Sequence, residues 1–320
     1  MPIISSSYSP SYLFRNGHIS TIYPNLFRKV SGVIQQRERI ELKDRDFIDL
    51  DWSYSTVQAS KLCILIHGLE GNGQRQYITG LAKYLNQNNW DTVAINLRNC
   101  SGEPNRKYRS YYAGVSEDLD FIINYISSSY AYSSLSICGF SLGGNVLLKY
   151  LGEGREIPSQ VCSGVAISTP CNLYDSLLQL NKPENVLYRI RFLRHLKKKL
   201  LEKQILFPDK IRISDIKKCK NLIDIDNLYT SVAHGYTNAL DYYQKCSSKQ
   251  FLPSIKIPSL IINAKNDTFL GADCYPYTEA SQNKNVFLET PDFGGHVGYY
   301  LPNHVFYNEI RTFEFIEEHL

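Results

Sequence analysis

The pattern of hydrophobic and polar positions switches repeatedly between short apolar runs and longer segments of helical periodicity. Six of the runs are short and almost wholly apolar, as is typical of parallel strands that are buried on both faces. They span residues 62–66, 92–96, 135–138, 161–168, 259–263 and 286–289. Apolar positions at helical spacing predict helices over residues 76–86, 115–128, 144–151 and 305–319. This order of elements predicts an α/β fold with a mostly parallel central sheet and flanking helices.

Two segments depart from this alternation. Residues 37–54 alternate between polar and apolar positions around Asp44-Arg45-Asp46, which predicts an antiparallel hairpin ahead of the parallel strands. Residues 173–243 are mostly helical by pattern, and we interpret them as a lid inserted into a single domain over residues 1–320. Five apolar residues of this segment fall at helical spacing and predict a stripe that packs on the main domain. They are Val186, Ile190, Leu193, Leu196 and Leu200, with Arg189, Arg194, Lys197, Lys198 and Lys199 around them.

The composition narrows the class of protein. With 43% hydrophobic residues, the 320-residue chain has ample material for a core, and no apolar stretch approaches the ~20 residues that span a bilayer. The N-terminal residues lack the basic and apolar regions of a secretory signal. Eight cysteines are scattered without C-x-x-C spacing. We therefore expect a reduced, cytoplasmic protein without a disulfide framework or a zinc site.

Charge is distributed unevenly along the chain. The net charge of +4 argues against a dedicated nucleic-acid binder. Residues 181–220 hold 13 Lys or Arg against 4 Asp or Glu, a net +9, so the rest of the chain carries −5. Two interpretations remain open for this basic segment: a solvated helical face, or peripheral contact with an anionic membrane surface.

The motif Gly139-Phe140-Ser141-Leu142-Gly143 stands between a predicted strand and a predicted helix, which is the context of a nucleophile elbow. A serine hydroxyl is a poor nucleophile until a base takes its proton, and a tight turn lifts it clear of its own backbone. The two flanking glycines permit the crowding of such a turn. The pattern predicts that Ser141 is a catalytic nucleophile.

An activated serine needs a histidine base. Among seven histidines, His296 lies in Gly294-Gly295-His296-Val297-Gly298, a glycine-rich loop between the last predicted strand and the last predicted helix. His67 ends a strand where the fold needs an oxyanion loop instead. The remaining five fall in the N-terminal segment, in the lid or in the terminal helix region: His18, His195, His234, His304 and His319. We predict that His296 is the base.

The base in turn needs a carboxylate that fixes its tautomer. Asp267 follows the strand predicted at 259–263 and precedes the histidine, which matches the chain order Ser, Asp, His. Asp273 falls past the end of the strand, and Asp292 is so close to His296 in sequence that it more simply shapes that loop. The prediction is therefore Asp267.

An oxyanion intermediate requires two backbone donors. The residue after the nucleophile supplies one, the N–H of Leu142. The loop Ile66-His67-Gly68-Leu69-Glu70-Gly71 follows the first predicted parallel strand and has the composition to supply the other, which we assign to the N–H of Leu69.

The chain resembles the α/β-hydrolase superfamily and, within it, the YheT-like family of esterases, which includes lipid-ester hydrolases and medium-chain acyltransferases. The motifs that carry the resemblance are spread over nearly the whole sequence. They are Phe14-Arg15-Asn16-Gly17-His18, Thr21-Ile22-Tyr23-Pro24, Arg37-Glu38-Arg39, Asp46-Phe47-Ile48-Asp49-Leu50-Asp51-Trp52, His67-Gly68-Leu69-Glu70-Gly71, Asn96-Leu97-Arg98-Asn99-Cys100-Ser101-Gly102-Glu103, Gly139-Phe140-Ser141-Leu142-Gly143-Gly144-Asn145, Asn266-Asp267 and Gly294-Gly295-His296-Val297-Gly298.

The resemblance implies the α/β-hydrolase fold and the same serine, acid and base. Three positions depart from the family pattern: Asn99 replaces a glycine, Tyr112 a histidine and Thr268 a proline. Asparagine also enters left-handed conformations, so Asn99 is compatible with the fold.

These residues predict a serine esterase that acts on short-to-medium-chain acyl or lipid esters. No metal or organic cofactor is expected, because the chain has neither clustered His and Cys ligands nor a G-x-G-x-x-G turn. Two alternatives stay open: an alcohol O-acyltransferase with the same three residues, and a non-enzymatic binding protein on a hydrolase scaffold.

Overall fold

The computed structural model describes residues 3–302 and 305–320, and in this part of the chain nine strands form one sheet. Their order is β1-β9-β8-β7-β6-β4-β5-β3-β2, and all neighbouring pairs are parallel except β2 with β3 and β3 with β5. The strands are β1 (Ile3–Ile4), β2 (Gln36–Glu41), β3 (Phe47–Ser53), β4 (Lys61–Ile66), β5 (Asp91–Asn96), β6 (Ser134–Phe140), β7 (Val161–Ile167), β8 (Ser259–Ile262) and β9 (Val286–Glu289). The architecture is the α/β fold with a mostly parallel central sheet that the sequence pattern predicts, with the antiparallel hairpin at one edge.

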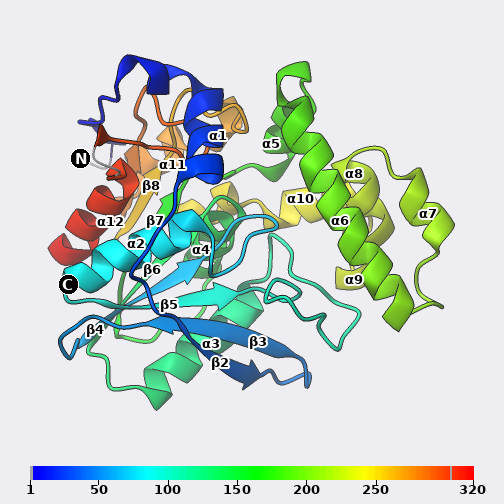
Figure 1. The fold of residues 1–320 in the computed structure, drawn as a ribbon, viewed down its shortest axis with the longest axis horizontal. Helices are drawn as coiled ribbons and strands as arrows, with labels where there is room; N and C mark the ends of the chain where they lie inside the picture. Colours follow the sequence, from blue (N-terminus) through cyan, green and yellow to red (C-terminus); the bar gives the residue numbers. More distant parts are fainter. Residues whose placement is uncertain (1–2, 303–304) are drawn as a thin grey trace.

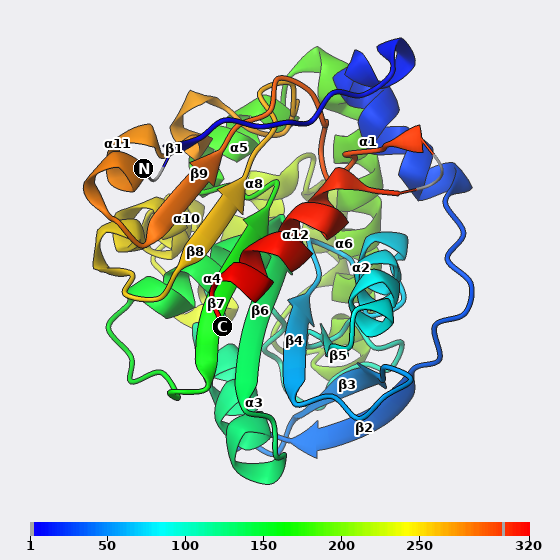
Figure 2. The ribbon, with the colours of Figure 1, turned by 90° about the vertical axis from the view of Figure 1, so that its left-hand side faces the viewer.

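Helices cover both faces of the sheet (Figures 1 and 2). Those outside the 173–243 segment are α1 (Gly17–Phe27), α2 (Gln76–Gln87), α3 (Ser116–Ser129), α4 (Leu142–Gly152), α11 (Tyr277–Gln282) and α12 (Tyr307–Glu318). Successive side chains of a strand point to opposite faces, so β4 sends Cys63 and Leu65 into the core under α2 and α12, and Ile64 into the core with α3 and α4. The nearly all-apolar composition of the parallel strands follows from this burial on both sides.

The predicted elements agree with the structure except at their ends. The main difference is at the elbow: β6 runs two residues further than predicted, to Phe140, and α4 begins at Leu142 instead of Gly144. Glycine is a poor helix former, so helix propensity predicts that the helix begins after Gly143. In the fold, close packing of the first turn of α4 on neighbouring backbone requires glycine there.

Residues 173–243 are helical, as predicted. The segment contains α5 (Leu173–Leu180), α6 (Val186–Leu206), α7 (Ile213–Lys218), α8 (Leu222–Ile225), α9 (Ser231–His234) and the start of α10 (Ala239–Cys246), with a π-helical turn at Asp226–Thr230. Figure 1 shows the long α6 with α7, α8 and α9 to one side of the sheet. A small apolar cluster within this segment holds these helices together, and it includes Leu200, Ile216 and Tyr229.

The predicted apolar stripe of α6 is wrong at two positions: one apolar residue assigned to the stripe is exposed, and one cation placed around it is turned inward. Ile190 is 48% exposed and points away from the protein, whereas Lys199 is turned inward. The buried face of α6 is rotated toward Phe192, Leu196 and Leu200. Because α6 carries aliphatic residues on more than one face, spacing alone does not select the buried one.

In the described ranges, no helix combines the length and the apolar character needed to cross a bilayer. All eight cysteines lie in these ranges as free thiols, and seven of them are buried.

Candidate active site

Ser141 is the single residue between β6 and α4. It has φ 53° and ψ −119°, a conformation that is costly for a residue with a side chain and is typical of functional turns. A Cβ atom at Gly139 would lie 2.4 Å from the carbonyl oxygen of Gly143, and one at Gly143 would lie 2.4 Å from that of Ile66. Both glycines are therefore required by close backbone approach, and the turn presents the Ser141 hydroxyl at the carboxyl end of the sheet.

Asp267, His296 and Ser141 form a continuous chain of hydrogen bonds. Nδ1 of His296 lies 2.8 Å from Oδ2 of Asp267, and Nε2 lies 2.9 Å from Oγ of Ser141. The other oxygen of Asp267 accepts the N–H of Phe269 at 2.9 Å, and the carboxylate is completely buried. A carboxylate at Nδ1 favours the tautomer whose proton is on that nitrogen, which leaves Nε2 free to accept the serine proton.

The N-terminal helix α1 holds the histidine loop in place. Thr21 on α1 accepts the backbone N–H of His296 through its hydroxyl oxygen at 2.8 Å, and Ser168 after β7 accepts the N–H of Val297 at 3.0 Å. A Cβ atom at Gly17 would lie 2.2 Å from the carbonyl oxygen of Asn266. The N-terminal motif of the resemblance is thus packed directly against the loops that carry the acid and the base.

His67 lies near the site but has a different set of contacts. Its Nδ1 lies 2.8 Å from the carbonyl oxygen of Gly68, and its Nε2 accepts the N–H of Leu97 at 3.2 Å. Burial lowers the pKa of His67 to about 3, so the ring is neutral and anchors the loop after β4.

The rival acids lie away from the base. Asp273 is 3.4 Å from the ammonium of Lys249, and the exposed Asp292 is 2.7 Å from that of Lys265. Among the other histidines, His195 lines a cavity beside Ser141, and His304 lies outside the described residues.

The loop after β4 faces Ser141. The N–H of Leu142 belongs to the first residue of α4, and the first N–H groups of a helix have no acceptor within it. Leu69 precedes Glu70, which has a φ of 56°, and a hydrogen bond from the Gly71 N–H to the Gly68 carbonyl closes the turn around them. Leu69, Leu142 and Ser141 line the same cavity, as the two oxyanion assignments require.

Glu70 connects this loop to α6. The hydroxyl of Tyr111 accepts the Glu70 N–H at 2.8 Å and donates to the Glu70 carboxylate at 2.7 Å. Lys199 of α6 donates to the same carboxylate at 2.9 Å, and Arg75 donates to the Glu70 carbonyl oxygen at 2.9 Å. Burial lowers the pKa of Lys199, but Cys100 and Glu70 more than offset this effect, so its pKa is raised and the ammonium stays charged. No local pattern in the sequence indicates this contact, because its partners are 129 residues apart.

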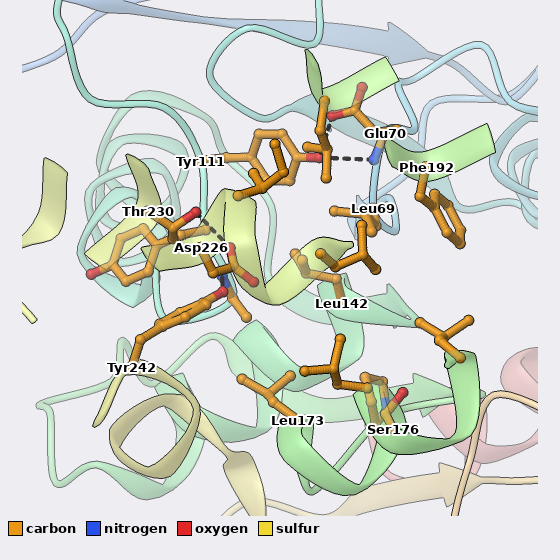
Figure 3. Close-up of a pocket in the computed structure, with 18 of the residues that line it drawn as sticks. Leu69, Glu70, Tyr111, Leu142, Leu173, Ser176, Phe192, Asp226, Thr230 and Tyr242 are labelled. Atoms are coloured by element: carbon orange, nitrogen blue, oxygen red, sulfur yellow. Dashed lines mark hydrogen bonds between the residues drawn. The ribbon is translucent and has the colours of Figure 1, made fainter. Parts of the chain in front are cut away.

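Two cavities meet at Ser141 and His296. The first has a volume of about 160 Å³ and reaches between α4 and the helical segment, with Leu142, Leu173 and Phe192 in its wall (Figure 3). The second, of about 150 Å³, lies toward α1 and is lined partly by Arg75, Arg191 and His195. Both chambers are mainly apolar, and each has cationic side chains in its wall: Lys199 and Lys203 in the first, Arg75 and Arg191 in the second.

A partly buried carboxyl lies in the wall of the first cavity. Asp226, in the π-helical turn, faces the cavity across from Leu142 and accepts a hydrogen bond from the Thr230 hydroxyl at 2.6 Å (Figure 3). Burial raises the pKa of Asp226 to about 6. In the sequence it is one of many acidic residues and has no motif around it, so its position depends on the tertiary fold.

Comparisons with known proteins agree with this architecture. Residues 62–302 match the family model of the alpha/beta hydrolase fold. The chain is 34% identical to the "Putative esterase YheT" of Escherichia coli over 92% of this chain and 87% of that protein. It is 27% identical to the "Phospholipase ABHD3" of Homo sapiens over 93% of this chain and 75% of that protein. A solved structure of the Pyrococcus furiosus esterase Pf2001 superposes with a TM-score of 0.59 at 18% identity, covering 91% of this chain and 98% of that one.

The fold is that of a hydrolase. The chain belongs to the α/β-hydrolase family, in its YheT-like branch.

The three departures from the family pattern are accommodated locally. Asn99 adopts a φ of 64°, which asparagine tolerates better than most residues. The Tyr112 ring stacks on His234 with ring centroids 4.0 Å apart. The Thr268 hydroxyl donates to the side chain of Asn185 at 2.8 Å, which ties the acid loop to the start of α6.

Proposed function

We propose that this carboxylic ester hydrolase forms an acyl-enzyme on Ser141, with His296 as the base and Asp267 as its carboxylate partner. The observation that carries the proposal is the hydrogen-bonded chain from Asp267 through His296 to Ser141, where two cavities meet. The direct test is release of p-nitrophenol from p-nitrophenyl acyl esters by the purified protein. Failure to cleave any acyl ester would contradict it.

In the first half of the reaction, Nε2 of His296 takes the proton of Ser141 as Oγ attacks the acyl carbon. The negative charge moves to the carbonyl oxygen, where the N–H groups of Leu69 and Leu142 are the proposed donors. The C–O bond to the leaving group then breaks, and His296 returns the proton to the departing alcohol. In the second half, water attacks the acyl carbon by the same route, which releases the acid and restores the serine.

The two cavities suggest how an ester would bind. The first chamber, here called the apolar chamber because leucines of α4 and α5 form much of its wall, suits the acyl chain, and the chamber near Arg75 and Arg191 suits the alcohol part. Residues 173–243, which contribute to both walls, would act as the lid of a single-domain hydrolase. A cavity of ~150 Å³ holds a molecule the size of benzene, so the apolar chamber favours short-to-medium acyl groups.

Acyl preference can be tested with two neighbouring leucines of α5. Leu177 is buried in the wall of the apolar chamber, whereas Leu178 is 47% exposed and outside it. We expect Leu177→Trp to lower kcat/KM for a hexanoyl ester relative to an acetyl ester by about tenfold or more, because one misfitted methylene already costs ~10-fold. The measurement is kcat/KM on both p-nitrophenyl esters.

Leu178→Trp is the matched control and should leave the ratio unchanged. If Leu177→Trp disturbs folding, the milder Leu177→Phe serves the same purpose. An unchanged ratio in a folded Leu177 variant would place the acyl chain elsewhere.

The contact between Lys199 and Glu70 predicts a role in positioning the oxyanion loop. Losing an oxyanion donor costs ~10²–10³ in turnover, and Lys199 acts on that donor only through Glu70. We therefore expect Lys199→Met to lower kcat by about tenfold with little change in KM. The neighbouring Lys198 has a side chain that is 79% exposed, so Lys198→Met is the control and should have wild-type kcat on a water-soluble ester. A rise in KM alone would mean that Lys199 binds substrate instead.

A further inference from the structure

The exposed side of α6 has an unusual composition. Every exposed residue of this helix is either a large aliphatic residue or a cation: Leu187, Ile190, Arg191, Arg194, Lys198, Leu201, Ile205 and Leu206. All but Leu206 recur at intervals of three or four residues and so form one stripe, here called the outer face of α6. A 21-residue helix is about 32 Å long, so the stripe extends over a large part of the protein.

A solvated helical face does not account for this stripe. Solvated faces carry polar residues of both signs, whereas Leu187 is 72% and Ile205 76% exposed. Single exposed aliphatic residues are common on protein surfaces, but an aligned row of them marks a contact surface, and cations beside the row favour an anionic membrane as the partner. Within the described residues, the only carboxylate within 4.0 Å of the three cations is Glu202, at 3.9 Å from Lys198.

The outer face of α6 continues toward the site. His18 on α1 lies 3.1 Å from the hydroxyl of Tyr188 on α6, so α1 and the N-terminal half of α6 are neighbours (Figure 1). Between them lies the second cavity beside Ser141, lined by Ile22 and Leu26 of α1 and by Arg191 of α6. Leu26 is 65% exposed, which adds an apolar residue at the α1 side of the same opening.

We propose that the outer face of α6, together with the exposed end of α1, docks on an anionic lipid surface. The aliphatic side chains would enter the interfacial region while Arg194 and Lys198 meet lipid phosphates. The uneven charge of the chain, +9 over residues 181–220 against −5 elsewhere, turns this side of the protein toward a negative surface. Docking in this orientation brings the opening between α1 and α6 to the membrane.

Vesicle co-sedimentation of the full chain tests the charge component. We expect binding to vesicles of phosphatidylcholine with phosphatidylglycerol at low salt, and weaker binding at high salt or to phosphatidylcholine alone. The double variant Arg194→Glu with Lys198→Glu should bind at least about thirtyfold more weakly, since each cation at the surface contributes about fivefold and charge reversal adds repulsion. Lys217→Glu with Lys218→Glu makes the same change of net charge on exposed residues of α7 and should weaken binding clearly less.

The apolar component has its own pair of variants. Leu187→Ser with Ile205→Ser should reduce binding, whereas Ile34→Ser with Val57→Ser, at exposed positions outside the outer face of α6, should not. A tryptophan introduced by Leu187→Trp should shift its emission to the blue on anionic vesicles, because both native tryptophans are already buried.

Several outcomes would overturn the proposal. The first is equal binding to neutral and anionic vesicles, and the second is an equal loss of vesicle binding in the two charge-reversal double variants. The third is that the protein self-associates and the outer-face variants convert it to monomers while vesicle binding stays unchanged. None of the vesicle measurements requires turnover, so they are independent of the proposed reaction. The melting temperature should stay at the wild-type value in all of the outer-face variants, which reports that they are folded, and hydrolysis of a water-soluble ester should stay at the wild-type level.

Discussion

Replacing Ser141 with alanine is expected to lower kcat on p-nitrophenyl esters by about 10⁶, to the residual rate that binding and oxyanion stabilisation provide. The reason is that Oγ of Ser141 is the atom acylated in the proposed mechanism, and it is the hydroxyl that lies 2.9 Å from Nε2 of His296. The same substitution should abolish labelling by a fluorophosphonate. Intact-mass measurement of the wild-type protein should show one adduct, and peptide mapping should assign it to the segment that contains Ser141.

Two controls make this result specific. The melting temperature of Ser141→Ala should match or exceed that of the wild type, because the residue occupies a positive-φ position whose cost does not depend on the hydroxyl. Ser141→Cys keeps a nucleophile at the same place and should remain reactive toward an acyl ester or an alkylating agent. If Ser141→Ala retained full activity and labelling, both the acyl-enzyme and the elbow assignment would be wrong.

The order of strands and helices could be predicted from the sequence, and so could the choice of Ser141, Asp267 and His296 as candidates. Both predictions depend on local sequence patterns. Buried parallel strands are recognisable as apolar runs, and the glycines around positions 141 and 296 mark turns that few other residues can make. These patterns can be recognised in the sequence without knowledge of the tertiary structure. The structure brings the three side chains together at hydrogen-bonding distances.

Contacts between distant segments could not be predicted in this way. Thr21 supports the His296 loop although the two residues are 275 positions apart. Lys199 contacts Glu70 from α6, where the sequence pattern does not distinguish it from the other cations of the helix. The outward position of Ile190 has the same origin. A helix with aliphatic residues on several faces is oriented by what it packs against, which periodicity does not reveal.

Replacing Asp267 with asparagine is expected to lower kcat by about 10⁴ while the fold is kept. Oδ1 of Asp267 already accepts the N–H of Phe269, so the asparagine carbonyl oxygen takes that position and its NH₂ group faces Nδ1 of His296. An amide donor at Nδ1 forces the ring proton onto Nε2, and His296 then cannot accept the proton of Ser141.

Asp292→Asn is the matched control, because this carboxylate is exposed and pairs with Lys265, and we expect near wild-type kcat. The measurements are kcat, the rate of fluorophosphonate labelling, which should fall in parallel, and the melting temperature. A folded Asp267→Asn variant that keeps wild-type kcat would remove Asp267 from the mechanism and leave His296 to be oriented by its backbone contacts alone.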